Sequence, residues 1–484
     1  MTGRRYMAVA LVALSICATG DGQLVANDYL PDLISEVDEA RIGAEQHDQI
    51  LAEFGGAYDD PKIAAYVDSI GQFLALTSER PNVKFTFTVL NSPIVNAFAL
   101  PGGYIYVSRG LLALAGDEAE LAGVIAHEIG HVAARHGAQR MSSGIMAQLG
   151  LGLLSILTDS PELSGIAQLG AMAAIQGYSR DQEFEADMLG VHYLERAGFD
   201  TEAMASFLAK MRAHSEVEGR IAGHSGSGDQ FDIFATHPRT AERVRRAVQA
   251  ANVSRVAQPI VGREIYLNKI NGMLFGDDPG QGVVRGRQFL HPDLGFRFEA
   301  PPDFSLLNGQ TQVLGRGPDG AILVFDADSR PDGRPMTGYL QDIWAEGTPV
   351  RELQRFYVDN REAATAMVRL DLNGQPADAR LIAIGFDSTV IYRFVFLTPT
   401  TVTAHFYPLF RETVYSFRGL SASEADAIRP HRLVLHWVRG GETSAQIASR
   451  MPSDRYALAR FLVLNGLYPN QALGQGWMLK TVVE

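Results

Sequence analysis

The pattern of apolar and polar positions divides the first half of the chain into helices and short strands. Residues 35–80 have a helical pattern, and residues 81–89 (PNVKFTFTV) alternate between apolar and polar side chains as a strand does. A second strand, residues 104–108 (YIYVS), follows a Pro-Gly-Gly turn. Residues 117–136 carry apolar side chains at helical spacing throughout, which predicts one long, buried helix.

The second half of the chain is richer in strand patterns. Three segments there favour strands and two favour helices: residues 296–301, 322–325 and 390–396, and residues 348–368 and 407–417. This mixture predicts an α+β domain with an antiparallel sheet, which follows a linker around residues 253–285. It contains no recognisable catalytic constellation, so we expect an accessory or scaffold role.

The predicted helix 117–136 contains the pattern H-E-x-x-H, formed by His127, Glu128 and His131. A helix turns about 100° per residue, so residues four apart share a face and both imidazoles can point at one metal ion. Glu128 can then reach the open side of the metal and take a proton from bound water. Small residues on this helix would let a second element approach closely: Gly123, Ala126 and Gly130.

The next histidine, His136, does not fit as a third metal ligand. It follows His131 by about 500° of turn and so lies about 140° from the ligand face; we expect it to end the helix, with Gly137 as the stop signal. Glu183 and Asp187 lie four apart in a second helical segment. Glu183 could complete a two-helix site that leaves one position for water. Asp187 is either the acceptor of a hydrogen bond from a ligand imidazole or a surface acid.

The chain resembles the HtpX/Oma/CAAX-endopeptidase family of zinc metallopeptidases, especially its soluble periplasmic branch. Five segments carry the resemblance: FGGAYDDPKIAAYVDSIGQFLA (54–75), VNAFALPGGYIYVSRGLL (95–112), AHEIGHVAARHG (126–137), SRDQEFEAD (179–187) and THPRTAERV (236–244). They span about residues 35–250. The resemblance implies a zincin-like, mainly α metallopeptidase domain with some strands, which we place at residues 21–260.

The same resemblance implies one Zn2+ held by His127, His131 and Glu183, with Glu128 as the catalytic base. It also implies a role for His237 near the metal. The residues themselves leave three readings of His237: it donates to the developing oxyanion, it occupies the fourth zinc position and keeps the enzyme latent, or it belongs to the first turn of a helix.

Two further residues and one strand belong to the same prediction. Arg243 either supports the metal site or pairs with an acid elsewhere, and Tyr178 is a second candidate for contact with the oxyanion. The resemblance places an edge strand beside the cleft, within residues 81–112. An extended substrate polypeptide would add to that edge through main-chain hydrogen bonds.

The chain of 484 residues is 46% hydrophobic and 20% charged, which suits a globular protein of two to four domains. Its formal net charge is -13, whereas nucleic-acid-binding proteins carry basic patches, so no nucleic-acid partner is expected. Residues 1–20 combine two arginines, an apolar run and small residues, as a secretory signal does, which predicts a periplasmic protein. Cys17 would allow a lipid anchor, but a bulky isoleucine precedes it.

Residues 145–175 contain two apolar runs between the two predicted metal-binding helices. The runs are shorter than a membrane span and contain polar residues. They favour a buried or lid-forming helical hairpin, with peripheral contact to a membrane or a hydrophobic client as the alternative.

Residues 430–484 resemble a LysM module, through VRGGET (438–443), IA (447–448), FLVLNGL (461–467) and LGQG (473–476). The pattern suits the order strand, helix, helix, strand. The resemblance implies binding of peptidoglycan glycans. Glu442 stands where the usual residue is Asp, and Trp437 lies on the first strand, so a module used only for packing is the alternative.

Taken together, the residues and the family resemblance predict a secreted zinc endopeptidase of the bacterial envelope. The resemblance implies that it acts on unfolded or misassembled proteins. We place the domain boundaries at 1–20, 21–260, 261–425 and 426–484. Two other functions remain open: a chaperone or adaptor stabilised by zinc with latent protease activity, and a hydrolase associated with peptidoglycan.

Overall fold

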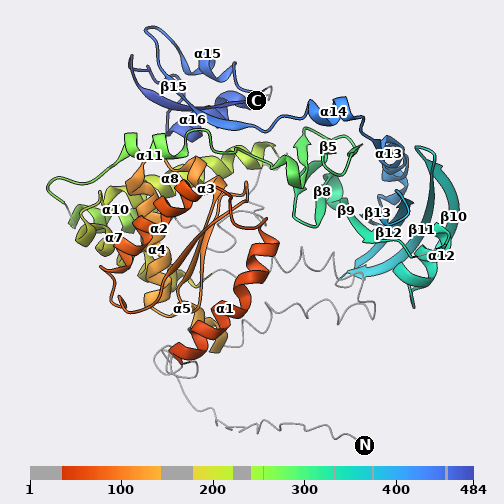
Figure 1. The fold of residues 1–484 in the computed structure, drawn as a ribbon, viewed down its shortest axis with the longest axis horizontal. Helices are drawn as coiled ribbons and strands as arrows, with labels where there is room; N and C mark the ends of the chain where they lie inside the picture. Colours follow the sequence, from red (N-terminus) through yellow and green to blue (C-terminus); the bar gives the residue numbers. More distant parts are fainter. Residues whose placement is uncertain are drawn as a thin grey trace, which may run out of the picture.

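The computed structural model describes residues 35–142, 178–221, 241–253, 256–331, 333–372, 375–452 and 456–484. Four features predicted above lie outside these residues: the targeting segment 1–20, Cys17, the apolar segment 145–175 and His237. Within the described ranges, no helix is both long enough and apolar enough to cross a membrane. The chain is a multidomain α+β protein with three parts (Figure 1).

The first part packs helices around a small sheet. Its helices are α1 (Glu36–Glu53), α2 (Pro61–Ala75), α3 (Arg109–Leu114), α4 (Glu118–Ala133), α5 (His136–Ser142), α7 (Arg180–Ala197), α8 (Glu202–Ile221), α10 (Ala241–Val253) and α11 (Arg263–Ile270). Its strands are β1 (Thr86–Leu90), β2 (Ala97–Leu100) and β3 (Tyr104–Ser108). The sheet order is β1-β3-β2, with β1 parallel and β2 antiparallel to β3, so β2 lies at an edge.

Helix α4 lies in the middle of this core. The side chain of Asp117 caps its first turn by accepting from the backbone N–H of Glu120, and every residue from Ala119 to Val132 is buried. The expected close approach at the small residues is confirmed: a Cβ on Gly130 would lie 3.0 Å from the carbonyl oxygen of Ala186 on α7. The backbones of α4 and α7 therefore nearly touch, which only glycine permits at this point.

The second part is rich in strands. Its large antiparallel sheet has the order β10-β11-β12-β13-β9-β8-β7, and a smaller one has the order β14-β6-β5-β4. The strands are β4 (Val283–Arg285), β5 (Gln288–His291), β6 (Phe296–Glu299), β7 (Ser305–Asn308), β8 (Gln312–Arg316), β9 (Ile322–Ser329), β10 (Arg351–Val358), β11 (Arg361–Leu372), β12 (Gln375–Gly385), β13 (Val390–Pro399) and β14 (Arg418–Gly419). The helices are η3 (Pro279–Gln281), η4 (Pro318–Gly320), α12 (Met336–Tyr339), the π-helical η5 (Leu340–Trp344), α13 (Thr403–Ser416) and α14 (Ala422–Asp426).

Alternating side chains of the large sheet build two separate cores. On β13, Phe394 and Phe396 face the small sheet and α13, whereas Val395 and Leu397 face α12 and η5. This two-residue period places one hydrophobic layer on each face of the sheet. The predicted antiparallel sheet and the helix predicted at residues 407–417 are both confirmed.

The helix predicted at residues 348–368 is wrong, because this segment forms the hairpin β10–β11. Its turn residues Asp359 and Asn360 have φ values of 48° and 60°, the left-handed pair that a tight hairpin turn requires. Alanines in this stretch favour a helix locally, but the ten-residue register with β12 outweighs that preference.

The third part, at the C-terminus, has the order strand, helix, helix, strand that residues 430–484 suggested. The elements are β15 (Arg432–Trp437), α15 (Ser444–Ala448), α16 (Ala457–Asn465) and β16 (Met478–Val483). The segment expected to be a linker is not one throughout. Helix α11 buries Tyr266, Leu267 and Ile270 in the first part, and residues 272–275 pair with the chain at 431–433. The chain therefore enters the strand-rich part and leaves it at neighbouring points.

A buried lysine joins the C-terminal part to the first part. Lys480 of β16 has 0% exposure, and its Nζ donates to the carbonyl oxygens of Ala113, Leu114 and Ala115 at 2.6, 3.1 and 2.6 Å. These carbonyls lie at the end of α3, and Asp117, the residue that caps α4, follows two positions after the last of them. The guanidinium of Arg263 donates to the next carbonyl, that of Gly116, and to that of Met478. The end of the chain thus fixes the start of α4.

Candidate metal centre

Helices α4 and α7 bring His127, His131 and Glu183 together. One ligand atom from each residue lies within 4.8 Å of the others, and these three form the one such group of three or more His, Cys, Asp or Glu residues in the described ranges. The Nε2 atoms of the two histidines are 3.0 Å apart. The Glu183 oxygens lie 3.4 Å from Nε2 of His131 and 3.7 Å from Nε2 of His127. All three side chains are buried, at 6%, 1% and 0% exposure.

This donor set fits a zinc ion. Bond lengths of about 2.0–2.1 Å in a tetrahedral site place neighbouring ligand atoms roughly 3.3 Å apart. The two Nε2 atoms, 3.0 Å apart, and Nε2 of His131 with Oε1 of Glu183, 3.4 Å apart, lie on either side of that value. Two imidazoles and one carboxylate also match the ligand types of catalytic zinc sites. His127, His131 and Glu183 are therefore the residues that could hold the metal.

Asp187, one turn after Glu183 on α7, connects this cluster to Arg243 on α10. Its Oδ1 lies 2.9 Å from Nδ1 of His127. Arg243 donates to both carboxylate oxygens of Asp187, from Nε and Nη2, each at 2.8 Å. The Nη1 of Arg243 also lies 2.5 Å from Oε2 of Glu183. The arginine therefore touches both acids of α7.

These contacts set the charge states of the buried groups. Burial opposes ionisation of Asp187, but the hydrogen bonds from Arg243 and His127 outweigh it and lower the pKa of Asp187 below its usual range. Burial likewise acts against the charged form of Arg243, yet Asp187, Glu183 and Glu128 raise the pKa of this guanidinium. A charged Arg243 between the two acids is thus the stable state of the site.

His136 lies elsewhere than the sequence indicated. Helix α4 ends at Ala133, Arg135 adopts a left-handed φ of 58°, and His136 begins the next helix instead of ending the first. The chain reversal turns the imidazole of His136 back toward α4, where its Nδ1 lies 2.9 Å from Nδ1 of His131. His136 has 0% exposure, and burial lowers its pKa. Sequence reasoning missed this contact, since a left-handed arginine gives no recognisable turn signal.

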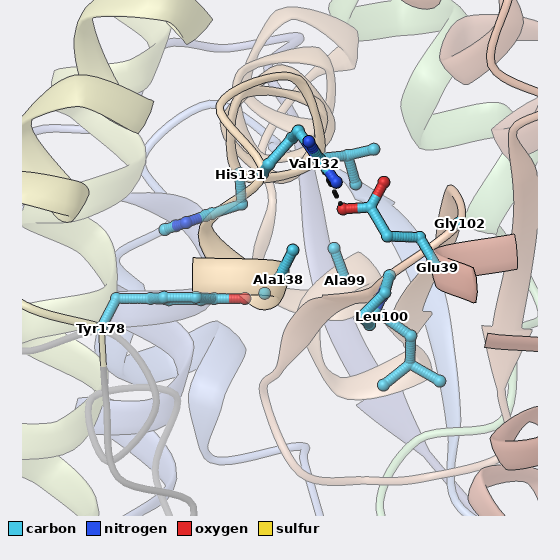
Figure 2. A pocket seen from close by; sticks show the side chains of 11 residues that line it. Glu39, Ala99, Leu100, Gly102, His131, Val132, Ala138 and Tyr178 are labelled. Carbon is cyan, nitrogen blue, oxygen red and sulfur yellow. Dashed lines mark hydrogen bonds and ion pairs between the residues drawn. The ribbon is translucent and has the colours of Figure 1, made fainter. Parts of the chain in front are cut away.

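Tyr178 packs against the same ligand candidate. Its ring stacks on the imidazole of His131, with centroids 3.8 Å apart and an interplanar angle of 19°. Figure 2 shows its hydroxyl directed toward Ala138 of α5. A small pocket lies beside these rings, lined by α1, the end of β2, α4, α5 and Tyr178. Inside it, Arg135 donates from Nε to Oε1 of Glu39 at 3.1 Å.

Three predicted features remain: Glu128, His237 and the edge strand. Glu128 follows His127 on α4 and is buried, at 1% exposure. His237 lies outside the described residues. Edge strand β2 contacts α4, so a sheet edge runs alongside the helix that carries the two histidines. The outer strand β2 of this sheet therefore lies beside the helix that carries the two histidines.

Comparison with known proteins gives a family match and several relatives. Residues 61–251 match the family model described as Peptidase family M48. The "Beta-barrel assembly-enhancing protease" of Escherichia coli (strain K12) is 30% identical over 285 residues, 55% of this chain and 57% of that protein. The "Mitochondrial metalloendopeptidase OMA1" of Schizosaccharomyces pombe is 28% identical over 214 residues, 43% of this chain and 59% of that protein. The chain therefore spans somewhat more than half the length of these curated relatives.

Among solved structures, similarity is low. The crystal structure of LpqN, described as involved in cell envelope biogenesis of Mycobacterium tuberculosis, aligns with a TM-score of 0.23 and 11% identity. The alignment covers 26% of this chain and 83% of that chain. So low a score indicates nothing about shared chemistry.

Proposed function

We propose that this chain, whose residues 61–251 match the model of Peptidase family M48, is a zinc-dependent endopeptidase of the bacterial cell envelope. The observation that carries the proposal is the convergence of His127, His131 and Glu183 from two helices, at separations that suit one tetrahedral zinc ion. The names of the relatives, an assembly-enhancing protease and a metalloendopeptidase, support the same activity.

The chain's own residues then have distinct roles. His127 and His131 offer Nε2 atoms and Glu183 offers a carboxylate oxygen. Asp187 accepts from Nδ1–H of His127, which keeps the lone pair on Nε2 available. Zinc bound there would supply Lewis-acid chemistry, polarising the scissile carbonyl and acidifying a bound water. Glu128 would then be the group that accepts a proton from water and delivers it to the leaving amine nitrogen.

Substrate recognition through main-chain groups follows from the sheet edge. Strand β2 is an edge strand, and an extended polypeptide can add to it by backbone hydrogen bonds. Backbone recognition requires an extended, unfolded segment and places few demands on side chains. Unfolded or misassembled envelope proteins are therefore the substrates we propose, in the periplasm.

The substitution Glu128→Gln tests the catalytic proposal. The amide keeps the size of the side chain but cannot accept the proton, so casein cleavage should fall by roughly 10²–10⁴-fold while zinc content stays near one per chain. Glu195→Gln, an exposed change on α7, is the matched control and should leave both unchanged. Casein cleavage at the wild-type rate by the Glu128→Gln protein would exclude Glu128 as the base.

The C-terminal part supports a second proposal, attachment to peptidoglycan through residues 430–484. Its order of strand, helix, helix, strand is that of the LysM-like pattern, and three aromatic side chains are exposed on it: Trp437, Tyr468 and Trp477. Pull-down with purified sacculi tests attachment, and a triple alanine variant should lose it. Comparing digestion of sacculi with digestion of denatured outer-membrane proteins separates an envelope protease from a hydrolase of cell-wall peptides.

A further inference from the structure

The two histidines of the metal cluster have different partners at Nδ1, the ring nitrogen that points away from the cluster. Nδ1 of His127 faces a carboxylate of Asp187 at 2.9 Å. Nδ1 of His131 instead faces Nδ1 of His136 at 2.9 Å, with the two rings edge to face at 70°. The exposure of His131 is 1% and that of His136 is 0%, so water does not compete for this contact.

The tautomers of these rings follow from the geometry. Nε2 of His131 points to the cluster, 3.0 Å from Nε2 of His127 and 3.4 Å from Glu183. A neutral imidazole that offers Nε2 to a metal carries its proton on Nδ1, so His131 is the donor. His136 must then accept at Nδ1 and carry its own proton on Nε2. That Nε2 lies 3.3 Å from a carboxylate oxygen of Glu185, which accepts.

The backbone is arranged to make this contact. A continued α4 would direct His136 about 140° away from the face that carries the ligands. The left-handed Arg135 breaks the helix and starts α5 at His136, which returns the imidazole to His131. Tyr178 covers the face of the His131 ring at 3.8 Å. The ring of His131 is thus held by Tyr178 on its face and by His136 at Nδ1.

We propose that His136 is a positioning residue for the metal, with Glu185 behind it. It fixes the tautomer and the orientation of His131 through the series Glu185, His136, His131, as Asp187 does for His127. The inference rests on the proposed zinc site at His127, His131 and Glu183. It assigns no contact between His136 and the metal or the substrate.

The test is zinc affinity of the purified full-length protein, measured by competition with a chromogenic chelator. His136→Leu fills the space but cannot accept a hydrogen bond, so zinc should bind roughly 10–100-fold more weakly. His136→Asn places an amide oxygen where Nδ1 stood and should recover most of the affinity. Glu185→Gln should cause a smaller loss. His47→Asn is the matched control, because His47 contacts Tyr106 away from the cluster.

A second readout separates positioning from folding. Cobalt added in place of zinc gives absorption bands that report ligand geometry; the bands should shift in the leucine variant and return in the asparagine variant, while circular dichroism of the metal-free proteins stays alike. Equal zinc affinity and equal cobalt bands in wild type and His136→Leu would overturn the inference, as would equal losses in His136→Leu and His136→Asn. His131→Ala tests the zinc site itself: full zinc binding there would instead overturn the proposed function.

Discussion

Replacing Asp187 by Asn should damage both the metal cluster and the packing of α10 on α7. Oδ1 of Asp187 lies 2.9 Å from Nδ1 of His127, and both its oxygens accept from Arg243 at 2.8 Å. An asparagine has one acceptor oxygen and one donor group. Its NH2 must therefore face at least one donor, either the imidazole N–H or the guanidinium.

The expected losses of stability and of zinc affinity follow from the groups that lose Asp187 as a partner. Arg243 has 5% exposure and would lose the negative charge of Asp187, the acid that accepts two of its hydrogen bonds. Breaking a buried ion pair by removing one charge costs about 3–5 kcal/mol. Loss of the acceptor behind a metal-binding imidazole costs roughly 10–100-fold in zinc affinity. Arg243 would also attract Glu183 more strongly, which opposes metal binding further.

Two measurements check this reasoning. The melting temperature of the metal-free protein reports the ion pair, and chelator competition reports zinc affinity. Asp181→Asn, an exposed change on the same helix, is the control and should alter stability by no more than about 0.5 kcal/mol. The double variant Asp187→Asn with Arg243→Met should regain part of the lost stability but not the zinc affinity. Wild-type zinc affinity in Asp187→Asn would refute the role given to Asp187.

Four further outcomes are expected. The pKa of Asp187 is lowered in the folded state. The contribution of Asp187 to stability is therefore complete above its unfolded pKa of about 3.9 and is lost as the pH falls through its folded pKa. Acid unfolding of Asp187→Asn should lack this pH-dependent loss of stability. Lys480→Met leaves three buried carbonyls without their donor and should cost roughly 2 kcal/mol or more, with faster amide exchange at residues 109–120; unchanged exchange would contradict the capping role. Gly130→Val would push α7 away from α4 and should abolish zinc binding; a variant that still binds zinc would show that the helices can separate without loss of the cluster. A chelator should stop casein cleavage and lower the melting temperature, with both restored by added zinc; activity in metal-free protein would contradict zinc dependence.

Periodicity was sufficient where local pattern and tertiary packing agree. Residues 104–108 follow a turn and form β3, and the apolar pattern at 117–136 gives α4. The spacing within H-E-x-x-H and between Glu183 and Asp187 describes single helix faces, so it needs only helical geometry. Neither spacing shows how two helices cross. The small residues on α4 predicted a close approach by some other element, and at Gly130 that element is α7.

Sequence reasoning failed where a non-local contact or an unmarked turn decides the structure. His136 was misplaced because helical geometry was extended past Ala133, although Arg135 reverses the chain without a glycine. Residues 348–368 were misassigned because pairing with β12 overrides helix-favouring alanines. The burial of Lys480 has no local signal at all, since its three partners lie at the C-terminal end of α3, far away in the sequence.

The capping of α3 by Lys480 has a consequence for biogenesis. The donor follows one of its acceptors, Ala115, by 365 residues in the chain. At a synthesis rate of about 5–20 residues per second, a nascent polypeptide waits roughly 20–70 s between making the acceptor and making its partner. Throughout that interval the helix bearing the H-E-x-x-H residues lacks one of its anchors. The start of this helix therefore gains its last contacts only when the C-terminal strand has been made and has folded.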